Sequence, residues 1–258
     1  MPKPLLLAQL SDLHIGSSWE GVDPVPRVER VVEAVRALPN KVDAVLVTGD
    51  VAGQGRDEEY EVARSLLDRF DCPVHVLPVN HDDRAGLRRA FDLPGEGAEP
   101  VNYSVAVGEL RLVAFDSSVP GQDPGAFSPE QLAWLEEELE REPRQPTLLA
   151  MHHSPLFTGI PGWDKVNLVR GEREKLAEVV SRHPQLRAIA GGHLHRVAAS
   201  TLAGCPVLSI PSTYVQSQPD FEPPDPENED VVFGGPPGFA LHVLLDGELA
   251  SQVEMLGA

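Results

Sequence analysis

Apolar residues in the first third of the chain follow two alternating patterns. Short continuous runs, of the kind that buried strands show, cover residues 4–12, 42–50 and 73–83, and each run ends in polar residues. Between these runs, apolar residues recur at helical spacing over 26–40 and 57–70. Strands that alternate with helices in this way predict an α/β fold with a parallel sheet.

The rest of the chain predicts further strands and helices in a less regular order. Two hairpins are expected, over 102–118 and 238–256. A helix over 128–139 begins with a capping box formed by Ser128 and Gln131. Two more apolar runs, 146–153 and 186–195, end in histidine, and 171–183 between them predicts a helix. The strands therefore fall into two groups.

Polar residues of a few types stand at the ends of five predicted strands. In chain order they are Asp12 and His14, Asp50, Asn80 with His81 and Asp82, His152 with His153, and His193 with His195. In open α/β sheets, ligands bind in the crevice outside the carboxyl ends of the strands. Each residue alone is typical of a turn, a cap or a satisfied polar side chain. The complete set predicts one shared site.

Metal binding is the chemistry that this set favours. Carboxylates, an amide and imidazoles without cysteine suit Mn²⁺, iron or Zn²⁺ better than Ca²⁺ or a soft metal. Two aspartates, one asparagine and four histidines are more ligands than a single tetrahedral zinc takes. Two ions that share a bridging carboxylate would use them all, as in two-metal phosphatases and nucleases.

Composition limits the classes of function and partner. The 258 residues carry a net charge of −19, so a nucleic-acid partner is not expected. We expect no membrane partner and a cytoplasmic protein, because no apolar stretch approaches ~20 residues and the N-terminus does not resemble a signal peptide. Cys72 and Cys205 are expected to be buried small hydrophobic residues. No linker is evident, which predicts a single domain over 1–258.

The ordered motifs resemble those of the calcineurin-like metallophosphoesterase superfamily. The family pattern Asp-x-His, Gly-Asp, Gly-Asn-His-Asp/Glu, His and Gly-His-x-His has the counterparts SDLH, TGD, VNHDD, MHH and GGHLH in this chain. Purple acid phosphatases have a tyrosine where this chain has Gly53, and Ser/Thr phosphatases have Asp-Arg soon after Gly-Asp. The stretches NHDDRAGLRRAF and AMHHSP are similar instead to class III cyclic nucleotide phosphodiesterases, a branch that includes glycerophosphodiesterases.

This resemblance implies a four-layer α/β/β/α sandwich with two mixed β-sheets and a centre of two metal ions (Mn, Fe or Zn). One ion would be held by Asp12, His14 and His195, the other by Asn80, His152 and His193, and Asp50 would bridge both. His152 is expected as the ligand of the adjacent pair, with His153 behind it. Val79 stands where the family usually has glycine, so the backbone before Asn80 is expected to differ.

The resemblance also implies a function and a mechanism. The substrate would be a small phosphodiester, with 3′,5′-cyclic nucleotides such as cAMP as the first expectation. A hydroxide between the two ions would attack phosphorus in line with the leaving oxygen. His81 would stabilise the transition state or protonate that oxygen. Asp82 would either orient His81 or, like Asp83, cap the helix that follows.

Other interpretations remain open. The chain could be a glycerophosphodiesterase or a phosphomonoesterase of the same fold, or a non-catalytic metal-binding regulatory protein. Trp19, Phe157 and Trp163 would either stack on a substrate base or pack loops. The acid-rich and proline-rich stretch 216–230 would be a surface loop, a flap or a partner contact. A homodimer is expected only from the general frequency of such assemblies.

Overall fold

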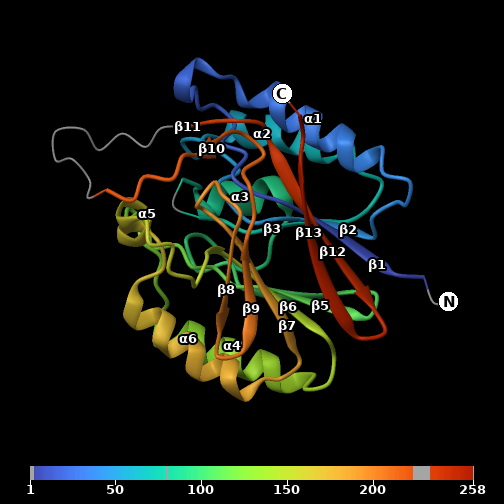
Figure 1. Cartoon of the computed structure of the whole chain (residues 1–258), viewed down its shortest axis with the longest axis vertical. Coiled ribbons are helices and arrows are strands. Elements are labelled where there is room, and N and C mark those ends of the chain that lie inside the picture. Colours follow the sequence, from blue (N-terminus) through green and yellow to red (C-terminus); the bar gives the residue numbers. More distant parts are fainter. Residues whose placement is uncertain (1–2, 80, 223–232, 258) are drawn as a thin grey trace.

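Two stacked β-sheets, covered by helices on both outer faces, make up the chain in the computed structural model (Figure 1). The structure describes residues 3–79, 81–222 and 233–257. Each sheet contains both parallel and antiparallel neighbours. These mixed sheets confirm the fold class predicted from the sequence.

The first sheet has five strands in the order β13-β12-β1-β2-β3. Their bounds are Glu248–Met255, Gly238–Leu245, Leu5–Leu10, Ala44–Val47 and Val74–Val76. β1, β2 and β3 run parallel, as the alternation of strands and helices predicted, and β12 pairs antiparallel with both β1 and β13.

The second sheet has six strands in the order β4-β5-β6-β7-β9-β8. Their bounds are Tyr103–Val107, Leu110–Ala114, Thr147–His153, Leu186–Gly192, Cys205–Ser209 and Ala198–Leu202. The four central strands are parallel, and antiparallel hairpins add β4 and β8 at the edges. A separate short pair joins β10 (Gln216–Ser217) to β11 (Phe233–Gly234).

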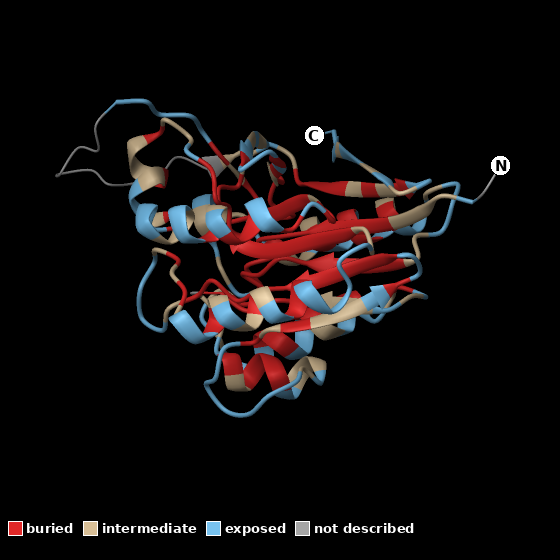
Figure 2. Ribbon diagram, turned by 90° about the horizontal axis from the view of Figure 1, so that it is seen from below, coloured by how far each residue is buried: buried red, intermediate tan, exposed pale blue. Residues whose placement is uncertain are grey.

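Three hydrophobic clusters connect the four layers. The first joins β1, β2 and β3 to α1 (Pro24–Arg36) and α2 (Asp57–Leu67), with the shorter α3 (Arg84–Phe91) beside them. The second joins β5, β6 and β7 to α4 (Pro129–Arg141) and α6 (Arg170–Arg182). The third lies between the sheets. Figure 2 shows the strands buried between helices whose outer faces are exposed.

Most of the predicted elements are present, some with shorter bounds. α4 starts at Pro129 behind the Ser128–Gln131 capping box, as predicted. The helix expected over 26–40 already ends at Arg36, and the strand expected over 73–83 is reduced to Val74–Val76. The sequence did not predict the hairpin of β8 and β9, the short helix α5 (Pro161–Val166) or the 3-10 turn η1 (Trp19–Gly21). Of the stretch 216–230, residues 223–230 lie outside the described residues.

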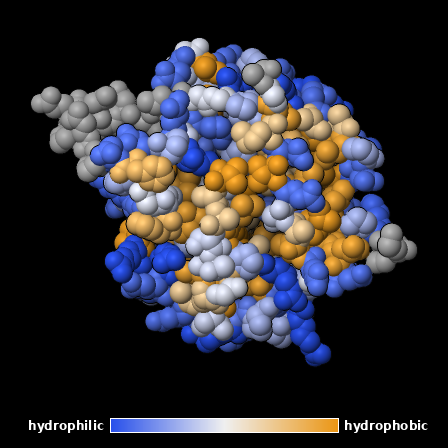
Figure 3. Space-filling model, viewed as in Figure 1, coloured by the Kyte–Doolittle hydropathy of each residue, from blue (hydrophilic) through white to orange (hydrophobic). Residues whose placement is uncertain are grey.

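Some surface and core expectations are refined by the structure. Cys205 is buried as expected, whereas Cys72 is half-buried. Apolar side chains gather on the face seen in Figure 3 over the region where Figure 1 places β12 and β13, and these strands expose Leu245 and Met255. In the described part of the chain, no helix has the length and apolar character needed to cross a bilayer.

Candidate metal centre

The predicted site residues lie at the carboxyl ends of strands in both sheets. The first sheet supplies Asp12 and His14 after β1, Asp50 after β2, and His81 and Asp82 after β3. The second sheet supplies His152 at the end of β6, and His193 and His195 after β7. Asn80, the remaining predicted ligand, lies outside the described residues.

Four of these side chains form one tight group. The candidate ligand atoms of Asp12, His14, Asp50 and His195 all lie within 4.8 Å of one another, and all four residues are buried. His14 Nε2 is 3.1 Å from His195 Nε2 and 3.2 Å from Asp50 Oδ2. His195 Nε2 is 3.4 Å from Asp12 Oδ1. This group matches the ligand set expected for one ion together with the expected bridge.

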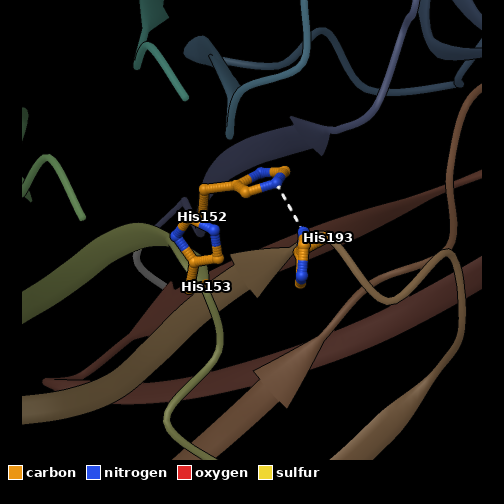
Figure 4. A group of neighbouring side chains, drawn as sticks. All are labelled: His152, His153 and His193. Atoms are coloured by element: carbon orange, nitrogen blue, oxygen red, sulfur yellow. Dashed lines mark hydrogen bonds between the residues drawn. The ribbon is translucent and has the colours of Figure 1, made fainter. Parts of the chain in front are cut away.

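His152 and His193 form a second group next to the first. Their rings point toward each other, with His152 Nε2 3.2 Å from His193 Nδ1 (Figure 4). His152 Nε2 is also 3.5 Å from Asp50 Oδ2. One oxygen of Asp50 therefore lies between His14 of the first group and His152 of the second, which is where a carboxylate shared by two cations must stand.

His153 is close to the second group, but both of its ring nitrogens are engaged elsewhere. Nε2 lies 2.9 Å from the carbonyl oxygen of Asp123, and Nδ1 lies 2.8 Å from Ser117 Oγ. Because a carbonyl only accepts, Nε2 carries the proton and Nδ1 accepts from the serine hydroxyl. These bonds favour His152 as the ligand of the adjacent pair.

Backbone carbonyls fix which nitrogen of three candidate ligand histidines faces the centre. His152 Nδ1 lies 2.7 Å from Thr48 O, His195 Nδ1 2.7 Å from Val215 O, and His193 Nε2 3.1 Å from Val166 O. These nitrogens must be the donors, so in the neutral rings the opposite nitrogens direct lone pairs inward. Histidines that bind metal are commonly oriented by such bonds.

The donor set fits cations for three reasons. The lone pairs of His152 and His193 face each other at 3.2 Å and repel unless a proton or a cation lies nearby. Asp50 Oδ1 and His14 Nδ1 are buried without a hydrogen-bond partner. Within the described residues, the ion-pair contacts of Asp12 and Asp50 are to histidines rather than to Lys or Arg. Buried carboxylates without a fixed positive partner suit a bound metal ion.

The pKa directions are those of metal ligands in their binding form. Burial raises the pKa of Asp50, but His152 and His14 outweigh burial and hold it well below its usual value. Burial also raises the pKa of Asp12, but His195 and His152 together outweigh burial and lower it. Burial lowers the pKa of His14, and it lowers that of His193 further. The carboxylates are thus ionised and these two imidazoles neutral near pH 7.

Backbone strain is concentrated at the centre. Nine non-glycine residues of the described chain have positive φ, and five of them are the candidate ligands Asp12, His14, Asp50, His193 and His195, with φ from 47° to 70°. Each such residue costs about 1–3 kcal/mol and persists only where the surrounding structure imposes it. Left-handed residues right after strands aim these side chains into the space between the sheets.

Two glycines permit the close approach of the two sheets at this point. A Cβ on Gly192 would lie 1.8 Å from Ser11 Oγ and 2.7 Å from Asp12 Oδ2. Gly49 has φ +93°, and a Cβ there would lie 2.7 Å from Val79 Cγ1 and 2.9 Å from His152 Nδ1. Val79 itself is buried and does not have positive φ, so the valine in place of the family glycine is accommodated without left-handed strain.

His81 and Asp82 lie beside the centre. The rings of His81 and His14 have centroids 5.1 Å apart, and His81 Nδ1 lies 3.2 Å from Gly53 O. The carboxylate of Asp82 accepts from the backbone N–H groups of Ala52, Val51 and Val79, at 3.0–3.3 Å, and so ties the loop after β2 to the loop after β3. Asp83, rather than Asp82, caps α3.

The pKa values of this pair shift in the same direction. Burial lowers the pKa of His81, but the Asp50 carboxylate and the Gly53 carbonyl outweigh it and raise the value overall. Burial raises the pKa of Asp82 to about 7.

Sequence reasoning left open or missed several residues around the centre. Trp19 is half-buried, with its ring 4.3 Å from that of His14, and the buried Trp163 lies 5.4 Å from His193. Both contacts depend on loop folding, which no sequence pattern indicated. Thr48 and Gln9 contribute buried hydrogen bonds behind the ligands. Gln9 is a polar residue within an otherwise apolar strand, and that was the available signal.

Comparison with known proteins identifies the family. A sequence model described as calcineurin-like phosphoesterase matches residues 5–197. The chain belongs to this family. It is 33% identical over 220 residues to a glycerophosphodiester phosphodiesterase, GpdQ, of Enterobacter lignolyticus, with 82% of this chain and 78% of that protein covered.

Two further similarities concern a second relative and the fold. The chain is 32% identical to the 3′,5′-cyclic adenosine monophosphate phosphodiesterase CpdA of Pseudomonas aeruginosa, over 83% of this chain and 78% of that protein. A dimetal phosphatase from Danio rerio superimposes with a TM-score of 0.70 at 14% identity, covering 97% of this chain and 96% of that one. The family match and the phosphodiesterase relatives make the chain a metal-dependent phosphodiester hydrolase, and the structural match shows the fold.

Proposed function

We propose that the chain hydrolyses 3′,5′-cyclic nucleotides such as cAMP at a centre of two metal ions. Asp12, His14 and His195 hold one ion, Asn80, His152 and His193 the other, and Asp50 is shared. The position of Asp50 Oδ2, 3.2 Å from His14 Nε2 and 3.5 Å from His152 Nε2, carries this proposal. A mix of carboxylate and imidazole without thiolate favours Mn²⁺, iron or Zn²⁺.

The cations meet the main chemical requirement of the reaction. A phosphodiester is anionic and leaves a poor alkoxide, so positive charge must be present where negative charge develops. Two metal ions held by these residues would supply that charge and would lower the pKa of a coordinated water. The side chains around them hold the ions, exclude water and deliver a proton to the leaving oxygen.

His81 is proposed as the group that protonates the leaving oxygen. Its Nδ1 lies 3.2 Å from Gly53 O, which can only accept, so Nδ1 keeps its proton and Nε2 is the atom that gives one up. Asp82 acts through the backbone, because its bonds to Ala52 and Val51 hold the loop of His81 against the loop of Asp50. Asp82 is therefore a positioning residue.

The location of Trp19 supports a nucleotide over a glycerol ester. The ring is 6.3 Å from that of His81, so it lies next to the leaving group that His81 would protonate. The Tyr214 hydroxyl anchors this turn, lying 2.7 Å from Val22 O and 3.1 Å from Trp19 O. Stacking of a base on such a ring contributes about 0.5–1.5 kcal/mol beyond area burial.

Glycerophosphodiester hydrolysis is the second candidate, and the similarity to the Enterobacter protein favours it. The test measures kcat/KM of metal-reconstituted protein on cAMP, cGMP, glycerophosphoethanolamine and p-nitrophenyl phosphate. We expect cAMP or cGMP to be the best substrate. A higher kcat/KM on the glycerol ester would favour the second candidate, and a higher value on the monoester would indicate a phosphomonoesterase. Two bound ions without activity on any ester would indicate a non-catalytic protein.

Trp19→Ala, with Trp134→Ala as control, tests the nucleotide subsite. Trp134 is also half-buried but stacks on Phe115, the residue after β5, outside the aromatic contacts of the centre. We expect Trp19→Ala to raise KM for cAMP about 2–10-fold, with little change for glycerophosphoethanolamine. An equal effect of Trp134→Ala would contradict this.

Location and assembly are predicted from the sequence. We keep a cytoplasmic location, a single domain over 1–258, a homodimer, and the absence of nucleic-acid or membrane partners as predictions. The net charge of −19 supports the exclusion of nucleic acid. Sedimentation velocity of the purified protein tests the dimer directly.

A further inference from the structure

The metal ligands are divided between the two sheets, so their geometry depends on how the sheets are placed relative to each other. Asp12, His14 and Asp50 follow strands of the first sheet, whereas His152 and His193 belong to the second. The core between the sheets consists of buried aliphatic and aromatic side chains. Apolar contacts are non-directional, so they do not by themselves fix the register of one sheet on the other.

A chain of buried polar side chains crosses this apolar core. Gln9 Nε2 lies 2.9 Å from Thr48 Oγ1 and 3.2 Å from the carbonyl oxygen of Gly191 in β7. Gln9 Oε1 lies 2.9 Å from His242 Nε2, and His242 Nδ1 lies 2.7 Å from Ser251 Oγ. Gln9, Thr48 and His242 are all fully buried. The bond to Gly191 connects the first sheet directly to the second.

The proton positions in this chain are determined by its partners. The Gly191 carbonyl can only accept, so the amide nitrogen of Gln9 must face it, and the amide oxygen then faces His242. His242 donates from Nε2 and accepts from Ser251 at Nδ1. The ring is neutral in this arrangement, in agreement with burial, which lowers the pKa of His242 to about 4.

Both partners of the Gln9 amide nitrogen, Thr48 and Gly191, lead on to metal ligands. The carbonyl of Thr48 accepts the Nδ1–H of His152. Gly191 is followed by Gly192 and His193, and the backbone N–H of His193 donates to the carboxylate of Asp12 at 3.1 Å. A shift of Gly191 relative to Gln9 would therefore move His193 relative to Asp12.

We propose that Gln9 and His242 are positioning residues that lock the two sheets in the register at which the metal ligands meet. The inference rests on the proposed metal centre and adds the device that assembles it. Two apolar side chains would fill the same space without burying any polar group. Buried polar side chains, in contrast, are tolerated only when all of their hydrogen bonds are made. The direction of these hydrogen bonds is what an apolar pair cannot supply.

The test separates positioning from stability with a double substitution. Gln9→Leu alone leaves the His242 N–H buried without a partner and is expected to lower Tm by about 2–12 °C. Gln9→Leu with His242→Leu removes both partners, so Tm should recover most of that loss. Metal affinity of the apo proteins, measured by chelator competition, should stay about 10–100-fold weaker than wild type in both variants.

Gln185→Leu is the matched control. Gln185 is a buried glutamine just before β7, and it donates to Leu139 O at 2.9 Å, at the end of the sheet away from the ligands. We expect it to lower Tm while metal affinity stays within about twofold of wild type. The Mn²⁺–Mn²⁺ coupling in the EPR spectrum should change in the Gln9 variants and not in the control.

Two results would overturn the inference. Recovery of both Tm and metal affinity in the double variant would show that the buried polar side chains serve stability alone. Unchanged metal affinity in Gln9→Leu, as in the control, would have the same meaning. If the Gln9 variants do not fold, His242→Leu removes the donor that orients the Gln9 amide, and unchanged affinity there would also refute it. Wild-type protein that binds no metal would instead refute the proposed function on which the inference rests.

Discussion

Gly49→Ala probes the tight packing at the candidate metal centre. Gly49 has φ +93°, where an alanine is strained by about 1–3 kcal/mol. The new Cβ would lie 2.7 Å and 2.8 Å from the two Cγ atoms of Val79, and such overpacking costs about 1–3 kcal/mol more. Alanine also restricts the unfolded chain more than glycine does, which offsets about 0.4–1 kcal/mol of this loss in stability. We therefore expect a loss of about 3 kcal/mol, or about 6–12 °C in Tm for a protein of this size.

The same substitution should weaken metal binding by a separate contact. The added Cβ would lie 2.9 Å from His152 Nδ1, the atom that donates to the Thr48 carbonyl. Displacing this ring moves the nitrogen that faces Asp50. Substitutions that disturb the groups supporting a metal ligand typically weaken metal binding 10–100-fold, and we expect about that loss here. Gly49→Ala with Val79→Ala removes the overlap with Val79, so part of the Tm should return while the loss of metal affinity remains.

The assay is thermal unfolding by circular dichroism together with metal uptake by the apo protein. Gly171→Ala is the control, because a Cβ there meets no atom within 4 Å and the site is in the first turn of α6. This control should leave Tm unchanged or slightly raised. The reasoning would be refuted if Gly49→Ala melted within about 2 °C of wild type and bound metal normally.

Further predictions concern individual side chains and the metals. His81→Ala should lower kcat about 10²–10⁴-fold while metal content is retained, and loss of the metals in this variant would reject the assignment. His152→Ala should lose metal whereas His153→Ala keeps it, because both nitrogens of His153 are bonded to protein. Loss of metal in His153→Ala but not in His152→Ala would make His153 the ligand instead. Adding metal at 100 times its Kd should stabilise the apo protein by about 2.7 kcal/mol, and an unchanged Tm would argue against a preformed site.

Local signals in the sequence located the regular elements well. The start of α4 follows from Ser128 and Gln131, which bond reciprocally to each other's backbone. The hairpin of β8 and β9 was missed because it turns at Ala203 and Gly204, with φ 49° and 85°, instead of at a typical Asn-Gly pair. Its strands are also rich in small residues. α3 has only eight residues and contains Gly86, so its helical pattern is weak.

The gathering of the candidate ligands was predictable because these residues follow strands whose carboxyl ends meet. Their orientation was not, since it depends on backbone carbonyls such as Thr48 O and Val215 O, which carry no sequence signature. The choice of His152 over His153 rested on a family motif, and the hydrogen bonds now give it a physical reason. The aromatic contacts of Trp19 follow from the path of a loop that tertiary packing determines.

Anomalous diffraction from crystals of the Mn²⁺-loaded protein tests the central claim most directly. The account predicts two peaks about 3.5–4 Å apart, one beside Asp12, His14 and His195 and one beside His152 and His193, with the Asp50 carboxylate between them. A single peak, or two peaks that do not share Asp50, would contradict it.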